Sequence, residues 1–124
     1  MNRYKNLSNE LFEKFPNIKQ LYLNEKEWYD DYLESPHIIF GELLNPTIIR
    51  LLKTHSGEEE LIRIFDFLEK LATDDDKLVR EVVQVTVLEQ IGDDKDVLQK
   101  SYKYMKKKTR YLSDLAEKSL GRKW

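Results

Sequence analysis

Six acidic residues in two short clusters are the strongest candidates for binding chemistry in this sequence. The clusters consist of Glu58, Glu59, Glu60, Asp93, Asp94 and Asp96. If the fold brings them together, only Lys95 offsets them locally, and such an acidic edge would attract a cationic partner. The alternative is that each acid simply caps or complements the start of a helix, where the helix dipole favours negative charge.

A basic stretch near the C-terminus could instead bind phosphate groups, since each neutralised phosphate releases counterions. The candidate phosphate ligands are Lys100, Lys103, Lys107 and Arg110. Tyrosines interleave with them, which is typical of nucleic-acid interfaces. Their helical spacing also fits one solvated stripe on a helix. Because the isoelectric point of the chain is near 5.8, nucleic-acid binding is the less favoured hypothesis.

An aromatic stripe could provide a second kind of partner contact. Trp28, Tyr29 and Tyr32 lie at helical spacing beside two aspartates. Trp and Tyr often contribute most of the binding energy at protein interfaces. The alternative is that the stripe belongs to the core.

The remaining reactive residue types form no catalytic or metal-binding pattern. His37 and His55 are far apart in sequence, and neither has a second histidine one helical turn away as in a HExxH-type helix. The chain has no cysteine and only four glycines. The aspartates at 74–76 lack the glycine and terminal glutamate of a calcium loop. We therefore expect no enzyme activity, no cofactor and no metal.

Composition indicates one folded domain over residues 1–124. Hydrophobic residues make up 40% of the chain and charged residues 35%. Residues 1–98 hold 12 basic and 21 acidic side chains, a net charge of −9, whereas residues 99–124 hold nine basic and two acidic ones, a net of +7. No apolar run reaches the roughly 20 residues of a membrane span. The absence of cysteine fits a reducing compartment, so we expect a cytoplasmic protein.

Three prolines divide residues 1–56 into short helices. The pattern predicts a helix capped at Ser8 and ended by Pro16, with Leu11, Phe12 and Phe15 on its apolar face. It predicts a second helix from Asn24 to before Pro36. Two further short helices, 37–44 and 46–54, should be hinged at Asn45–Pro46, because proline disfavours helix continuation.

Residues 57–120 have no proline, which permits longer antiparallel helices. Apolar residues recur at helical spacing over 58–72. Residues 77–91 are ambiguous, because valines alternate with polar residues as in a strand; length, an acidic cap and a final glycine favour a helix. From 93 to 120 only Thr109 suggests a break. The fold expected is an all-α bundle of about six to seven helices.

Antiparallel packing of these longer helices makes two predictions about charge. The aspartates at 74–76 should approach Lys107, Lys108 and Arg110, which would neutralise them. The glutamates at 58–60 should meet the aspartates at 93–96, which produces the acidic edge.

The string DDDKLVREVVQVTVLEQIGDDKDVLQKSYKYM resembles a HEAT-type helical repeat. The matching residues are Asp76, Val79, Arg80, Val83, Leu88, Gly92 and Asp93. Val83 stands where the family usually has alanine, and Ile91 where it usually has leucine. The resemblance implies a HEAT-like helical array over about residues 58–110, as a single unit because no second copy is visible. The whole chain is also similar to small bacterial helical proteins of the toxin–immunity type.

These observations favour a non-catalytic, intracellular protein-binding module over an enzyme. Its most concrete form is a bacterial immunity protein that occludes a cognate toxin, such as a cationic toxin domain, through acidic and aromatic surface. The alternatives are a nucleic-acid-associated protein that uses the basic C-terminal helix, and a helical regulatory or structural protein that forms a homodimer.

Overall fold

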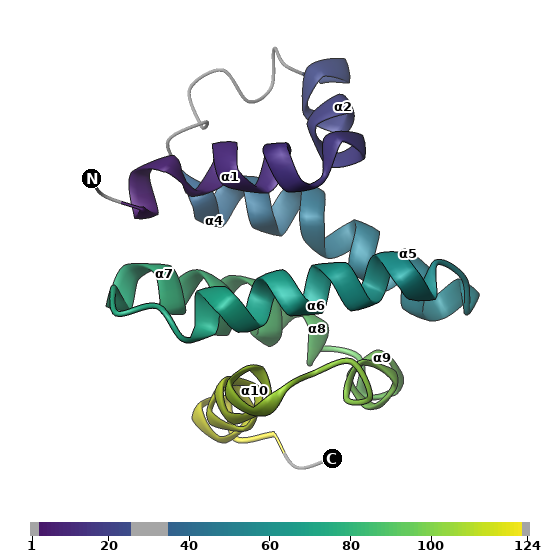
Figure 1. The fold of residues 1–124 in the computed structure, drawn as a ribbon. Coiled ribbons are helices and arrows are strands. Elements are labelled where there is room, and N and C mark those ends of the chain that lie inside the picture. The colour runs from purple at the N-terminus through teal and green to yellow at the C-terminus, as the bar shows by residue number, and fades with distance from the viewer. Residues whose placement is uncertain (1–2, 26–34, 123–124) are drawn as a thin grey trace.

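A computed structural model describes residues 3–25 and 35–122, which form an all-α bundle (Figure 1). Within these ranges there are seven continuous helices and no strand. The elements are η1 (Tyr4–Asn6) with α1 (Leu7–Lys14), α2 (Pro16–Asn24), α4 (Pro36–Ile39) with η3 (Phe40–Leu44) and α5 (Asn45–Thr54), α6 (Glu58–Ala72), α7 (Lys77–Glu81) with η4 (Val82–Leu88) and α8 (Glu89–Ile91), α9 (Lys95–Ser101), and α10 (Lys107–Ser119). The predicted fold class is confirmed. None of the described helices is both long and apolar enough to cross a bilayer.

The first helix begins earlier than predicted. The chain is already helical from Tyr4, and Ser8 is a buried residue inside α1 rather than its cap. The apolar face formed by Leu11, Phe12 and Phe15 is buried as expected. Pro16 does end α1, but it also begins α2, because proline is well suited to a first helical position. The sequence pattern did not predict this helix.

Residues 36–54 form one continuous helix, so the predicted hinge at Asn45–Pro46 is wrong. A proline inside an α-helix clashes with the carbonyl four residues before it. Here a wider π-type turn, η3, precedes the proline, closed by a bond from the N–H of Asn45 to the carbonyl of Phe40. Pro46 then occupies the first turn of α5. The wider turn accommodates the proline without breaking the helix.

Residues 77–91 also form one helix, which confirms the helical interpretation over the strand alternative. Its middle, η4, is a second π-type segment, with Val83, Val87 and Leu88 buried. The two π segments pack against each other. Asn45 donates a hydrogen bond to the carbonyl of Thr86 over 2.9 Å, and the Thr86 hydroxyl is hydrogen-bonded to the ring of His37. Polar contacts therefore fix the register of the two irregular helices.

The predicted helix 58–72 forms the centre of the bundle as α6. Its buried face consists of Leu61, Ile64, Phe65, Phe67, Leu68, Leu71 and Ala72. In Figure 1, α6 lies between the N-terminal helices above it and the α9–α10 layer below it. The predicted amphipathic face is thus confirmed, because the layers on both sides cover it.

The last stretch breaks at residues 102–106, between α9 and α10, and not at Thr109. Thr109 is fully buried in the first turn of α10. The carboxylate of Glu69, from α6, accepts bonds from the N–H groups of Lys108 and Thr109 over 3.1 and 2.9 Å, and from the Thr109 hydroxyl over 2.9 Å. A side chain from another helix therefore fixes where α10 begins.

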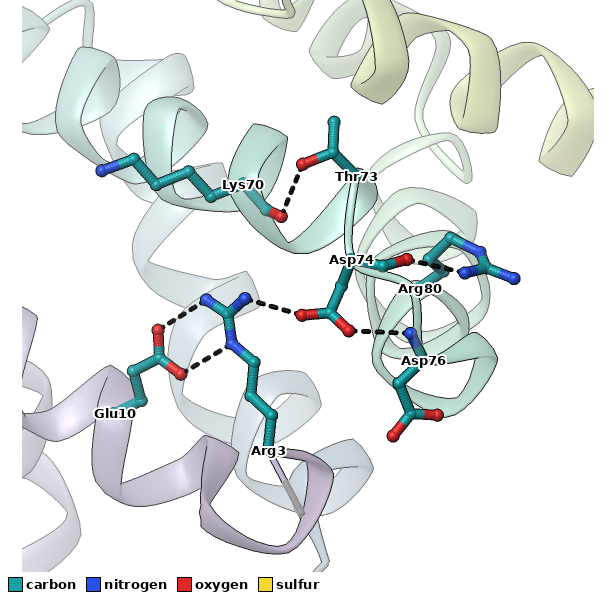
Figure 2. Close-up of polar contacts among 7 residues, drawn as sticks. All are labelled: Arg3, Glu10, Lys70, Thr73, Asp74, Asp76 and Arg80. Carbon is teal, nitrogen blue, oxygen red and sulfur yellow. Dashed lines mark hydrogen bonds and ion pairs between the residues drawn. The ribbon is translucent and has the colours of Figure 1, made fainter. Parts of the chain in front are cut away.

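An arginine near each end of the described chain ties it to the bundle. Figure 2 shows Arg3 bonded to Glu10 of α1 and, over 2.7 Å, to Asp74 in the turn after α6. Arg122 binds Asp93 and Glu117 in the same manner, at 2.7 and 2.6 Å. Arg3 is thus the salt-bridge partner of Asp74, in place of the lysines and arginine at 107–110 that the sequence suggested.

Candidate functional site

The start of α6 carries the first acidic cluster, and two of its three glutamates have basic neighbours. A carboxylate oxygen of Glu58 lies 3.8 Å from the ammonium of Lys103, and one of Glu60 lies 3.1 Å from the guanidinium of Arg63. Glu59 is exposed. Gly57, which precedes the helix, has no side chain with which to cap it.

The turn between α8 and α9 carries the second acidic cluster, where each aspartate also has a basic neighbour. Asp93 pairs with Arg122 at 2.7 Å, Asp94 with Lys53 at 3.9 Å, and Asp96 with Lys100 at 3.0 Å. Asp94 additionally caps α9 by accepting bonds from the next backbone N–H groups.

The expectation that only Lys95 offsets the acidic edge is therefore wrong. Cations from α5, α9, the 102–106 segment and the end of the chain lie against these acids, and sequence spacing could not reveal them. In two of the five pairs, Lys53–Asp94 and Glu58–Lys103, both partners are exposed, and exposed ion pairs contribute about 0–1 kcal/mol each. The cations offset the charge of the edge, and these two pairs hold its side chains only weakly.

A cleft of about 380 Å³ opens where the end of α5, the start of α6 and α9 meet. Its lining residues are Leu51, Leu52, His55, Ser56, Glu58, Leu61, Gln99, Lys100, Lys103 and Tyr104. Leu51, Leu52 and Leu61 are nearly inaccessible and form an apolar floor. In Figure 1 the end of α5, the start of α6 and α9 all lie on the right-hand side, with α9 below the other two. The cleft volume lies at the lower end of the range of ligand pockets, roughly 300–1,000 Å³.

Two residues with a left-handed backbone conformation shape the α5–α6 connection beside this cleft. His55 has a φ of 54° and Gly57 a φ of 67°. His55 ends α5, as its sequence position suggested, and its side chain lines the cleft. The other histidine, His37, lies elsewhere, hydrogen-bonded to Thr86. In residues 3–25 and 35–122 no cluster of three His, Asp or Glu side chains could hold a metal ion.

The four candidate phosphate ligands do not form the continuous stripe that one helix would give. Lys100 belongs to α9, Lys103 to the 102–106 segment, and Lys107 and Arg110 to α10. The Arg110 guanidinium lies 3.7 Å from the ring centre of Tyr102 and pairs with Asp114 at 3.2 Å. Burial raises the pKa of the Tyr102 hydroxyl, which Arg110 partly opposes. Lys100 and Lys103 do come together, but in the cleft beside Glu58.

Glu58, from the acidic clusters, and Lys100 and Lys103, from the basic stretch, thus line the same cleft. Trp28, Tyr29 and Tyr32 lie outside the described residues. Sequence reasoning missed the leucine floor, because Leu51 and Leu52 read only as helix core. The glycine that ends the α5 region was the available signal, since it marks a tight turn between two helices.

Comparison with known proteins gives a family match over most of the chain. The family model described as a domain of unknown function, DUF7674, matches residues 8–119. This range includes all three helices that border the cleft. No curated protein and no solved structure matches the chain.

Proposed function

We propose that this chain, which belongs to the DUF7674 family, is a non-catalytic intracellular protein-binding module that docks its partner at the cleft between α5, α6 and α9. The observation that carries the proposal is the combination of an apolar floor with a rim of exposed, weakly paired charges. Clefts with this composition bury apolar groups while a few polar ones set orientation.

Charged groups of a partner can replace the members of the weak ion pairs at the rim of the cleft. Glu58 and Lys103 are each 65% exposed in their side chains and stand 3.8 Å apart. Separating such a pair costs little, so an incoming charged group can replace either member.

The most concrete form of this proposal is an immunity protein that blocks a toxin sterically. Because basic side chains offset the acidic edge, we expect the protein to act by covering the partner's surface rather than by attracting it through long-range charge. Association should then depend only weakly on salt, since steering requires a face with one dominant sign of charge.

Site-directed photocrosslinking in the native cell tests the proposal. Gln99 lines the cleft, whereas Gln20 is an exposed residue of α2, and that helix lies on the opposite side of the bundle from α9 (Figure 1). With p-benzoylphenylalanine in place of Gln99, we expect one discrete crosslinked protein, identifiable by mass spectrometry. The same replacement of Gln20 is the matched control.

A crosslinked product from both positions, or from neither, contradicts docking at this cleft. If the crosslinked species is nucleic acid, the basic residues carry the function instead. The immunity form requires in addition that the captured protein is toxic when produced alone and loses its toxicity when this chain is produced with it.

A further inference from the structure

We propose that the cleft between α5, α6 and α9 binds the carboxyl terminus of a peptide segment of the partner. The last apolar side chain would lie on the floor of Leu51, Leu52 and Leu61, and the terminal carboxylate against Lys100 and Lys103. This inference rests on the proposed protein-binding function and specifies which part of the partner enters the cleft.

The charges of the lining residues favour an anionic group, although acids surround the cleft. Two lysines, Lys100 and Lys103, line it against one carboxylate, Glu58. The remaining five acids of the two clusters lie outside the lining. The lining therefore carries one more lysine than carboxylates, and charge complementarity points to a carboxylate as the ligand.

Glu58 acts as the internal competitor for this site. Its carboxylate lies 3.8 Å from the Lys103 ammonium, longer than the 2.7–2.9 Å of a close charged hydrogen bond. Lys100 is held more closely, at 3.0 Å, by Asp96 one turn earlier on α9. A ligand carboxylate can thus displace Glu58 from Lys103, while Lys100 stays in place at the edge of the cleft.

The apolar floor indicates that the carboxylate belongs to a chain end rather than to an acidic side chain. A C-terminal residue carries its apolar side chain and its carboxylate on the same Cα, so both reach one cleft together. An Asp or Glu side chain brings no apolar group of its own. Tyr104 forms a fixed wall, because its ring stacks on Phe65 with centres 6.0 Å apart. Recognition of terminal carboxylates is a recurrent mode of peptide binding.

A pair of short peptides provides the direct test. The probes are acetyl-Gly-Val-Leu with a free carboxylate and the same peptide as its carboxamide, each titrated into the full ¹⁵N-labelled chain. We expect the free acid to shift the amide signals of Ser56, Gln99 and Lys103, and the carboxamide to bind at least severalfold more weakly. Inorganic phosphate is the third probe and should not reproduce these shifts.

Two substitutions with opposite expected signs sharpen the test. Glu58→Gln removes the competitor and should strengthen binding of the free acid about two- to fivefold, the range expected for an exposed pair. Lys103→Gln should weaken it by a similar factor. The controls, Glu59→Gln and Lys107→Gln, make the same charge changes at exposed positions outside the lining and should leave the affinity unchanged.

Several results would overturn the inference. If the free acid and the carboxamide bind equally well, the peptide's carboxylate contributes nothing to binding. If inorganic phosphate causes the same shifts, the cleft is a general anion site. Weaker binding of the free acid by Glu58→Gln together with stronger binding by Lys103→Gln would show that the peptide's carboxylate does not lie against Lys103. In each case crosslinking from Gln99 separately reports whether a protein docks here, so failure of this inference is distinguishable from failure of the proposed function.

Discussion

Substitution of Gly57 by alanine should damage both the stability of the bundle and the floor of the cleft. Gly57 has a φ of 67°, and for a residue with a Cβ this left-handed conformation costs about 1–2 kcal/mol. The new Cβ would stand 2.6 Å from Cδ2 of Leu51, well inside contact distance. Leu51 must then leave its rotamer, at about 0.5–1.5 kcal/mol. The expected total is about 1.5–3.5 kcal/mol.

Gly121→Ala separates the backbone penalty from the clash. Gly121 has a φ of 70°, and a Cβ there meets nothing within 4 Å. Arg122 anchors this segment through Glu117 and Asp93, so the strain cannot be relieved merely by release of the chain end. We expect Gly121→Ala to destabilise by no more than about 1–2 kcal/mol. Urea denaturation measures both variants, with a lower midpoint at unchanged slope.

The binding readout connects this prediction to the cleft. If the Leu51 side chain moves away from the new Cβ in Gly57→Ala, it enters the cleft above the leucine floor. The affinity for the free-acid peptide should then fall. Gly121→Ala should bind like the unmodified chain. Equal destabilisation by the two substitutions, with unchanged binding, would refute the argument that the new Cβ forces Leu51 out of its rotamer at a measurable cost.

Two further substitutions test the polar contacts that hold the bundle together. Glu69→Ala removes the acceptor that caps α10 and leaves the buried Thr109 hydroxyl without that partner. We expect urea denaturation to show a free energy of unfolding lower by about 1–3 kcal/mol, against less than about 0.5 kcal/mol for the control Lys70→Ala. Equal losses for the two variants would contradict the capping role. The backbone N–H of Asp76 and the Arg3 guanidinium hold the pKa of Asp74 below its ordinary 3.8. Because the folded-state pKa is lowered, this carboxylate stabilises the fold above about pH 4 and the contribution is lost as pH falls through the folded pKa. Asp74→Asn should therefore be less stable at neutral pH and lose less stability on acidification than the unmodified chain, as followed by circular dichroism, whereas a parallel pH profile would exclude the linkage.

The parts of the fold that depend on local pattern were predictable. The 58–72 helix has apolar residues at helical spacing, and its predicted face is the buried one. The 77–91 segment alternates like a strand over a few valines, but its length and its acidic cap outweighed that signal. Asp76 does cap α7, accepting from the N–H of Leu78 over 2.9 Å.

The parts that depend on remote contacts were not predictable. Pro46 reads as a hinge because nothing nearby reveals the π turn that accommodates it, and Asn45 reaches Thr86 on another helix. Thr109 reads as the break because its true partner, Glu69, lies 40 residues earlier in the chain. The counterions of the acidic edge were missed for the same reason, since they come from distant segments such as Lys53 and Arg122.

The difference between clamped and loosely held charges decides which residues can report on function. Arg122 is 18% exposed in its side chain and holds the 10%-exposed Glu117 at 2.6 Å, so its removal would leave a buried carboxylate without that partner and destabilise the fold. Any effect of that substitution on binding would be ambiguous. Glu58 and Lys103 are both mostly exposed and separated by 3.8 Å, so their substitution should change stability by less than about 0.5 kcal/mol. Because the same two residues belonged to opposing hypotheses, one for a cationic and one for an anionic partner, the direction in which each changes affinity reports the sign of the partner's charge.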